Sequence, residues 1–193
     1  MNKEYIETIF KNELALIHND FMKEIAVKTL MAAPDEFWSA PASSSGKYHA
    51  EDERRAGGLV LHEKKVVKYA HFFAQEPDCW DEMKANNYIA YDGLIVSALL
   101  HDCVKSGNPW GPQTVSNHPK LAAELVIRVN GNNPYTQAVA RTIEAHMGWK
   151  WGDAVWGNET NKAKTLCQKL LCRADMMGSR SWVITDVSNM DIR

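Results

Sequence analysis

Residues 92–107 read DGLIVSALLHDCVKSG, a hydrophobic segment that ends in a histidine, an aspartate and, three positions later, a lysine. The apolar run from Leu94 to Leu100 is typical of a buried helix. His101 follows Leu94 and Ala98 at steps of seven and three residues, so its imidazole lies on the same buried face. Since a His-Asp pair alone occurs by chance in many chains, its meaning depends on the other histidines.

Helical periodicity with end signals recurs along the chain, and strand signals are scarce. Asn133, Pro134 and Gly148 delimit one helix, and Gly131 is a stop signal for the helix before it. The expected helices cover residues 3–17, 20–33, 57–73, 78–86, 91–102, 116–131, 133–148 and 160–177. Residues 34–56, which contain prolines and a run of three serines, form a long loop of a kind that is usually functional or mobile. We therefore predict an all-α helical bundle in a single domain.

Composition and charge exclude several classes of protein. The chain has 193 residues, 45% hydrophobic and 24% charged, as expected for one compact globular domain. A net charge of -2 with a pI near 6.4 offers no global basic field for long duplex nucleic acid. The apolar runs are much shorter than the roughly 20 residues that span a bilayer. The four cysteines lack CxxC spacing and no signal peptide is evident, so we expect free thiols, no membrane partner and a cytoplasmic location.

Six histidine and aspartate residues are expected at inward positions on separate helices or at helix ends. They are His62, His101, Asp102, His118, His146 and Asp175. A single inward histidine is more often a hydrogen-bonded core residue than a metal ligand. Burying four imidazoles and two carboxylates apart from one another, however, would cost several kcal/mol in unsatisfied polar groups. Gathering them around a cation removes most of that cost, and nitrogen and oxygen ligands suit Zn, Fe or Mn.

The remaining histidines provide a comparison. His71 lies nine residues after His62, about 180° around the helix, so we expect it to face solvent. His18 falls in a turn between helices and is expected at the surface. His49 lies in the long loop, where it has two interpretations: a surface residue, or part of a lid that faces the metals.

The order of the six residues and their flanking sequences resemble the HD-domain superfamily of metal-dependent phosphohydrolases, and specifically its branch with six ligands and two metals. The matching blocks are YHAEDERRAGGLVLHE (48–63), ALLHDCVKSG (98–107), SNHPKLAAEL (116–125), EAHMGWKW (144–151) and LLCRADMMGSR (170–180). The resemblance covers roughly residues 48–181. It implies a bundle of the HD-domain type, with residues 48–193 as the catalytic region. Residues 1–47 carry no part of the resemblance, and we expect them to form N-terminal helices and a loop packed on the core.

The resemblance also implies a role for each of the six residues. One divalent cation would be bound by His62, His101, Asp102 and Asp175. A second would be bound by His118 and His146, with Asp102 bridging the two. The metal could be Mn, Fe, Ni, Zn or Mg. Two cations about 3.5–4 Å apart can share a water, lower its pKa and clamp a phosphoryl group, so the bridging hydroxide is the expected nucleophile.

Asp102 and Lys105 are the expected catalytic residues. Lys105 stands in the HDxxK form, one turn after the aspartate. There its ammonium group would neutralise a non-bridging phosphate oxygen, whereas the alternative is a solvated surface lysine.

Four further residues are candidates for substrate binding. Trp149 and Trp151 follow His146 in a loop, where they could stack on a nucleobase or pack in the core. Arg180 is a candidate for holding phosphate, and His49 for facing the substrate.

The sequence therefore favours a phosphohydrolase or phosphodiesterase that acts on a nucleotide or short oligonucleotide through a metal-activated hydroxide. The alternative is an HD-fold di-iron oxygenase, because some members of that class have the same six protein ligands. A homo-oligomer also remains open.

Overall fold

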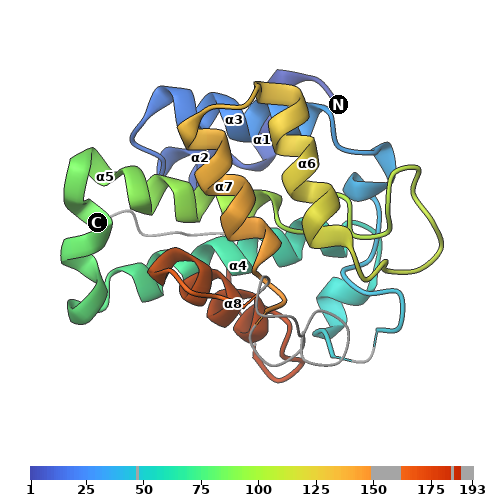
Figure 1. Ribbon diagram of the computed structural model, residues 1–193. Helices are drawn as coiled ribbons and strands as arrows, with labels where there is room; N and C mark the ends of the chain where they lie inside the picture. Colours follow the sequence, from blue (N-terminus) through green and yellow to red (C-terminus); the bar gives the residue numbers. More distant parts are fainter. Residues whose placement is uncertain (47, 149–161, 184, 188–193) are drawn as a thin grey trace.

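The computed structural model describes residues 1–46, 48–148, 162–183 and 185–187, and over these residues the chain is helical without strands (Figure 1). The α-helices are α1 (Lys3–Ile9), α2 (Lys11–Ala15), α3 (Asp20–Met31), α4 (Gly58–Ala74), α5 (Pro77–Leu100), α6 (His118–Asn130), α7 (Pro134–Glu144) and α8 (Leu166–Gly178). Two short 3-10 helices, η1 (Asp35–Trp38) and η2 (Glu51–Arg54), lie in the long loop after α3. The prediction of an all-α fold is confirmed.

Helix α5 is at the centre of the bundle. It packs against α3, α4, α7 and α8, while α6 and α7 pack against each other. Every residue from Tyr91 to Leu100 is buried, which explains why this stretch is almost continuously apolar. The helix therefore brings its carboxyl end, and with it His101 and Asp102, into the interior of the molecule.

The backbone of α5 is interrupted between its two arms. Asn86, Asn87 and Tyr88 have φ values of 50°, 57° and 63°, in the left-handed region that asparagine tolerates better than most residues. The two predicted helices at 78–86 and 91–102 correspond to these arms, although the second arm ends at Leu100.

Other helix ends also differ from prediction. The expected helix 3–17 is divided at Phe10 into α1 and α2. The last helix begins at Leu166, because the Thr165 hydroxyl accepts a hydrogen bond from the Gln168 amide and caps the helix there. Helix α7 ends at Glu144, so the histidine at 146 lies in the following turn.

The N-terminal helices pack onto the bundle through apolar and charged contacts. Ile6 and Phe10 are fully buried in a core cluster that extends to Ala174 in α8. Glu13 of α2 is also fully buried, and its carboxylate accepts hydrogen bonds from the Lys64 ammonium of α4 at 2.9 and 3.0 Å. Residues before the long loop therefore share one core with the helices that follow it.

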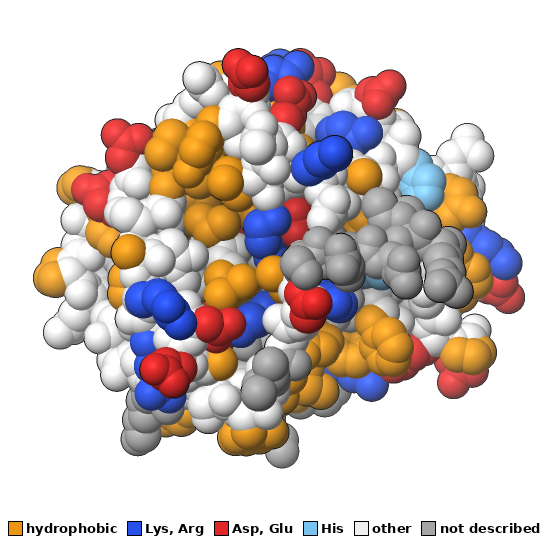
Figure 2. Space-filling model, turned by 180° about the vertical axis from the view of Figure 1, so that it is seen from behind, with side chains coloured by type: hydrophobic (Ala, Val, Ile, Leu, Met, Phe, Trp, Pro, Cys, Tyr) orange, Lys and Arg blue, Asp and Glu red, His pale blue; other side chains and the backbone are white. Residues whose placement is uncertain are grey.

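The outer surface carries mixed charge. On the face drawn in Figure 2, acidic and basic side chains are interspersed among the described residues, in agreement with the net charge of -2. Among the described helices, none combines the length and apolar character needed to cross a membrane.

Candidate metal centre

The six predicted ligands meet in the interior, and Asp102 lies at their centre. Its Oδ2 atom is 3.6 Å from His101 Nε2 and 3.9 Å from His62 Nε2. Its Oδ1 atom is 3.0 Å from His118 Nε2 and 3.7 Å from His146 Nε2. The two oxygens of one carboxylate thus face two different pairs of histidines.

The sixth residue, Asp175 of α8, closes the first group. Its Oδ1 atom lies 3.1 Å from His62 Nε2 and 3.7 Å from His101 Nε2. In the second group, the Nε2 atoms of His118 and His146 are 3.2 Å apart. Ligand atoms lie within 4.8 Å of one another in His62, His101 and Asp102, in His101, His146 and Asp175, and in Asp102, His118 and His146, a spacing at which one cation can contact three of them.

The histidines of the second group are oriented by the backbone. His118 Nδ1 donates to the Val115 carbonyl oxygen, and His146 Nδ1 donates to the Ile143 carbonyl oxygen, both at 2.7 Å. A neutral imidazole carries only one N–H, so these bonds leave a lone pair on each Nε2 atom. The two histidines therefore direct acceptor atoms at each other and at the Asp102 carboxylate.

The histidines of the first group have carboxylate partners as well. His62 Nδ1 donates to Glu53 Oε1 at 3.2 Å. His101 Nδ1 lies 2.8 Å from Glu63 Oε2, and the other oxygen of Glu63 accepts a hydrogen bond from the Asp102 amide at 3.2 Å. Both glutamates are fully buried. Glu53 thus fixes the His62 ring with Nε2 towards the centre, whereas His101 Nδ1 donates to the Ala98 carbonyl oxygen at 3.0 Å with Glu63 close by.

The electrostatics of the centre suit a divalent cation. Burial, reinforced by the neighbouring His101 and His118, lowers the pKa of His146 to about 3, so this ring is a neutral acceptor. Although burial raises the pKa of Asp102, the nearby Lys105 and His101 hold it well below its usual range, so the carboxylate is ionised. Within the described chain, the buried His101 Nε2 and Asp102 Oδ1 atoms make no hydrogen bond of good geometry. Buried ligand atoms that lack a hydrogen bond, as these two do, are satisfied when a cation binds between them.

Lys105 lies beside this centre. Its Nζ atom is 2.5 Å from Asp102 Oδ2, and its side chain, 14% exposed, reaches the cavity that opens onto the ligands. The ammonium group of Lys105 thus lies next to the Asp102 carboxylate, which both histidine groups share.

A cavity of about 310 Å³ opens onto the centre. Its lining residues are Ser43, Ser44, Ser45, Tyr48, His49, Asp102, Lys105, Thr114, His118, His146, Met147, Asp175 and Ser179. His49 is buried in the cavity wall, and its ring packs edge-on against His62 with centroids 4.9 Å apart. Of its two sequence-based interpretations, the structure places it facing the centre.

The other substrate-binding candidates are less defined. Trp149 and Trp151 lie outside the described residues. Arg180 follows the cavity residue Ser179, and its guanidinium group lies 5.5 Å from the centre of the Trp182 ring. Roles for these three candidates in substrate binding stay predictions.

Sequence reasoning missed two carboxylates and misplaced one histidine. Glu63 directly follows His62 in the sequence, but Glu53 lies in the loop, where no periodicity marks it. The expectation that His71 faces solvent is wrong: it is half-buried, with Nδ1 2.6 Å from the Tyr91 hydroxyl, because the second arm of α5 covers it. The exposed His18 agrees with prediction.

Comparison with known protein families matches residues 61–177 to the HD domain. No curated protein matches the chain, and neither does any solved structure. The matched span contains all six predicted metal ligands and Lys105, whereas Glu53 and His49 precede it.

Proposed function

The chain belongs to the HD-domain superfamily of metal-dependent hydrolases, and on that basis we propose that it hydrolyses phosphoester or phosphoanhydride bonds of a nucleotide or short oligonucleotide. Residues 48–193 would form the catalytic region, and residues 1–47 would pack on it. The proposal assigns the chain to the branch of the superfamily with six ligands and two metals.

One observation carries the binuclear assignment: the two oxygens of Asp102 face different histidine pairs. Oδ1 lies 3.0 Å from His118 Nε2, and Oδ2 lies 3.6 Å from His101 Nε2. A site for one cation would use only one of these groups and would leave the other set of buried acceptors without a partner. A carboxylate shared by two cations satisfies both groups.

The chemistry follows from the residues around the centre. Two divalent cations, of Mn, Fe, Ni, Zn or Mg, would lower the pKa of a shared water and neutralise charge on a phosphoryl group. Lys105 would contribute an ammonium that binds a non-bridging phosphate oxygen. The hydroxyl groups of Ser43, Ser44 and Thr114 line the same cavity and can donate to the remaining phosphate oxygens.

The rest of the substrate would be held by the candidates around the mouth. We assign His49 to hydrogen bonding with the substrate, because its ring lines the cavity. Trp149 and Trp151 would stack on the base, and Arg180 would hold a phosphate.

The second candidate is a di-iron oxygenase, which the same set of four imidazoles and two carboxylates would serve. The Lys105 ammonium and the hydroxyl groups that line the cavity suit an anionic phosphate better than the uncharged polyol that an oxygenase would take as its substrate. They therefore favour the hydrolase.

The deciding experiment compares the Mn-loaded protein under anaerobic conditions with the iron-loaded protein in air. Nucleotides, dinucleotides, cyclic nucleotides and short oligonucleotides form the substrate panel. We expect the Mn form to release phosphate or a nucleoside monophosphate without oxygen. Activity that requires iron and consumes oxygen would refute the hydrolase and support the oxygenase.

A further inference from the structure

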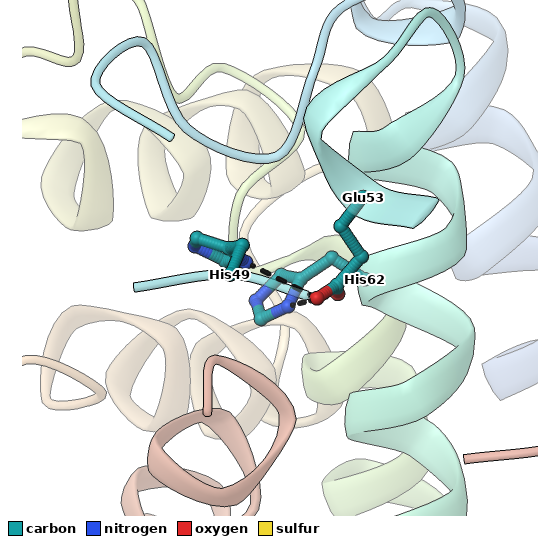
Figure 3. Close-up of side chains that lie close together, drawn as sticks. All are labelled: His49, Glu53 and His62. Atoms are coloured by element: carbon teal, nitrogen blue, oxygen red, sulfur yellow. Dashed lines mark hydrogen bonds and ion pairs between the residues drawn. The ribbon is translucent and has the colours of Figure 1, made fainter. Parts of the chain in front are cut away.

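Glu53 is a fully buried carboxylate that serves several partners at once (Figure 3). Its Oε1 accepts a hydrogen bond from His62 Nδ1 at 3.2 Å. Its Oε2 accepts one from the Ala50 amide at 3.3 Å and lies 3.5 Å from His49 Nδ1. The Lys65 ammonium is also 3.5 Å from Oε2. One side chain of the long loop therefore contacts both a metal ligand and a residue of the cavity wall.

Two features of α4 are fitted to this carboxylate. The side chain of Lys65 is 1% exposed, and its ammonium is shared between Glu53 and Asp52, 3.2 Å away, so the buried negative charge is balanced. A Cβ atom at Gly58 would lie only 1.9 Å from the Glu53 carbonyl oxygen. Glycine at the start of α4 is thus what allows the backbone of η2 to approach closely enough for Glu53 to reach His62.

The consequence is a fixed orientation for the His62 imidazole. A neutral ring that donates Nδ1–H to a carboxylate keeps its lone pair on Nε2. For His62 this lone pair points at the centre, where Nε2 lies 3.1 Å from Asp175 Oδ1. The His49 ring lines the cavity, and its Nδ1 lies 3.5 Å from Glu53 Oε2 without a hydrogen bond of good geometry.

We propose that Glu53 is a positioning residue that fixes His62 as a metal ligand through Oε1, while its charge lies beside the His49 ring in the cavity wall. It lies outside the span that matches the HD domain, so the long loop supplies part of the metal centre's support. The inference rests on the metal centre of the proposed function, but it does not depend on the substrate.

The test is the Zn²⁺ affinity of the Glu53→Gln variant, titrated in competition with a chromophoric chelator. Glutamine keeps the length of the side chain but loses the charge and offers one acceptor oxygen in place of two, so the Ala50 amide and His62 Nδ1 can no longer both be served. We expect the affinity of the tighter site to fall by about 10- to 100-fold, the usual effect of removing an outer partner of a metal-binding histidine. Nitrogen-15 NMR of the metal-free protein should show a changed tautomer population for His62.

Glu13→Gln is the matched control. Glu13 is also fully buried, and it forms an ion pair with Lys64, the residue before Lys65 in α4. It does not belong to any of the candidate metal-binding groups among the described residues. We expect this variant to lose stability without losing Zn²⁺ affinity. If Glu53→Gln does not fold, Glu53→Asp replaces it: the charge stays, the reach shortens by one methylene, and affinity should again fall.

The outcomes separate the two proposals. Wild-type affinity in the folded Glu53 variant, or an equal loss in the Glu13 control, would overturn the positioning role alone. Failure of the wild-type protein to bind Zn²⁺ would overturn the metal centre itself, and with it the proposed function.

Discussion

Replacing Asp102 by asparagine should remove the binuclear centre while preserving the shape of the side chain. The amide has one oxygen where the carboxylate has two. It can therefore serve either the His118 side, 3.0 Å from Oδ1, or the His101 side, 3.6 Å from Oδ2. Its nitrogen would direct N–H donors at the other group of ligands, and the negative charge shared by both sites would be lost.

The expected magnitude is large. Polarisation by paired cations supplies several kcal/mol of transition-state stabilisation, and a loss of about 4 kcal/mol corresponds to about 10³-fold in rate. We therefore expect Asp102→Asn to lower turnover by at least about 10³-fold and bound metal from about two ions per chain towards one. Elemental analysis after reconstitution with Mn, and turnover on the same preparation, measure both.

Asp92→Asn provides the control for this experiment. Asp92 lies on α5, the helix that leads to Asp102, is also buried, and accepts hydrogen bonds from the backbone amides of His18 and Asn19 at 3.0 and 2.8 Å. Its replacement should destabilise the fold without changing metal content. Normal metal content and near wild-type turnover in the Asp102 variant would refute the shared-carboxylate reasoning.

Three further variants test separate parts of the structure. Lys105→Met should lower turnover by about 10²-fold or more with little change in metal content, because it removes one donor that would stabilise negative charge in the transition state. A parallel loss of metal would contradict a role for Lys105 in binding phosphate. Substituting His118 and His146 together by alanine should reduce bound Mn from about two ions to about one, and unchanged stoichiometry in elemental analysis would rule out the second site. Burial lowers the pKa of His71, so protonation favours the unfolded state and stability should decline as pH falls below about 6.5. Thermal melts of His71→Asn should show a weaker decline, and an identical pH profile would contradict this assignment.

The helices and the inward position of the six predicted ligands could be predicted because their signals are local. The cap at Asn133 followed by Pro134 starts α7 as expected, and Asn133 accepts hydrogen bonds from the amides of Tyr135 and Thr136. The apolar steps that lead to His101 likewise place it inside. Such patterns depend only on neighbours in the sequence.

The exact ends of the helices depend on hydrogen bonds from side chains to the backbone, which the spacing of apolar residues does not predict. Three ligand histidines direct Nδ1 at the carbonyl oxygen three residues earlier, and the distances for His101, His118 and His146 are 3.0, 2.7 and 2.7 Å. Carbonyls at the end of a helix have no partner in the helix, so they are available to a ring in the next turn. For this reason α5 and α7 stop just before their ligands.

The support around the ligands could not be predicted, because it depends on the approach of distant segments. Glu53 reaches His62 only because the backbone of η2 packs against Gly58. His71 is covered only because α5 returns alongside α4 and brings the Tyr91 hydroxyl to it. Neither contact produces a repeat or a regular spacing of residues from which it could be predicted.

The outer partners divide the centre into two halves of unlike charge. In one half His62 donates to the buried Glu53 carboxylate, and Glu63 and Asp175 lie close to His101, which itself donates to the Ala98 carbonyl oxygen. In the other half both imidazoles donate to the neutral carbonyls of Val115 and Ile143. Carboxylate-backed imidazoles are the stronger donors. Loading should therefore be sequential, with the first ion retained through dialysis and the second exchanging with the surroundings. On the proposed two-metal mechanism, turnover would then follow the occupancy of the weaker half.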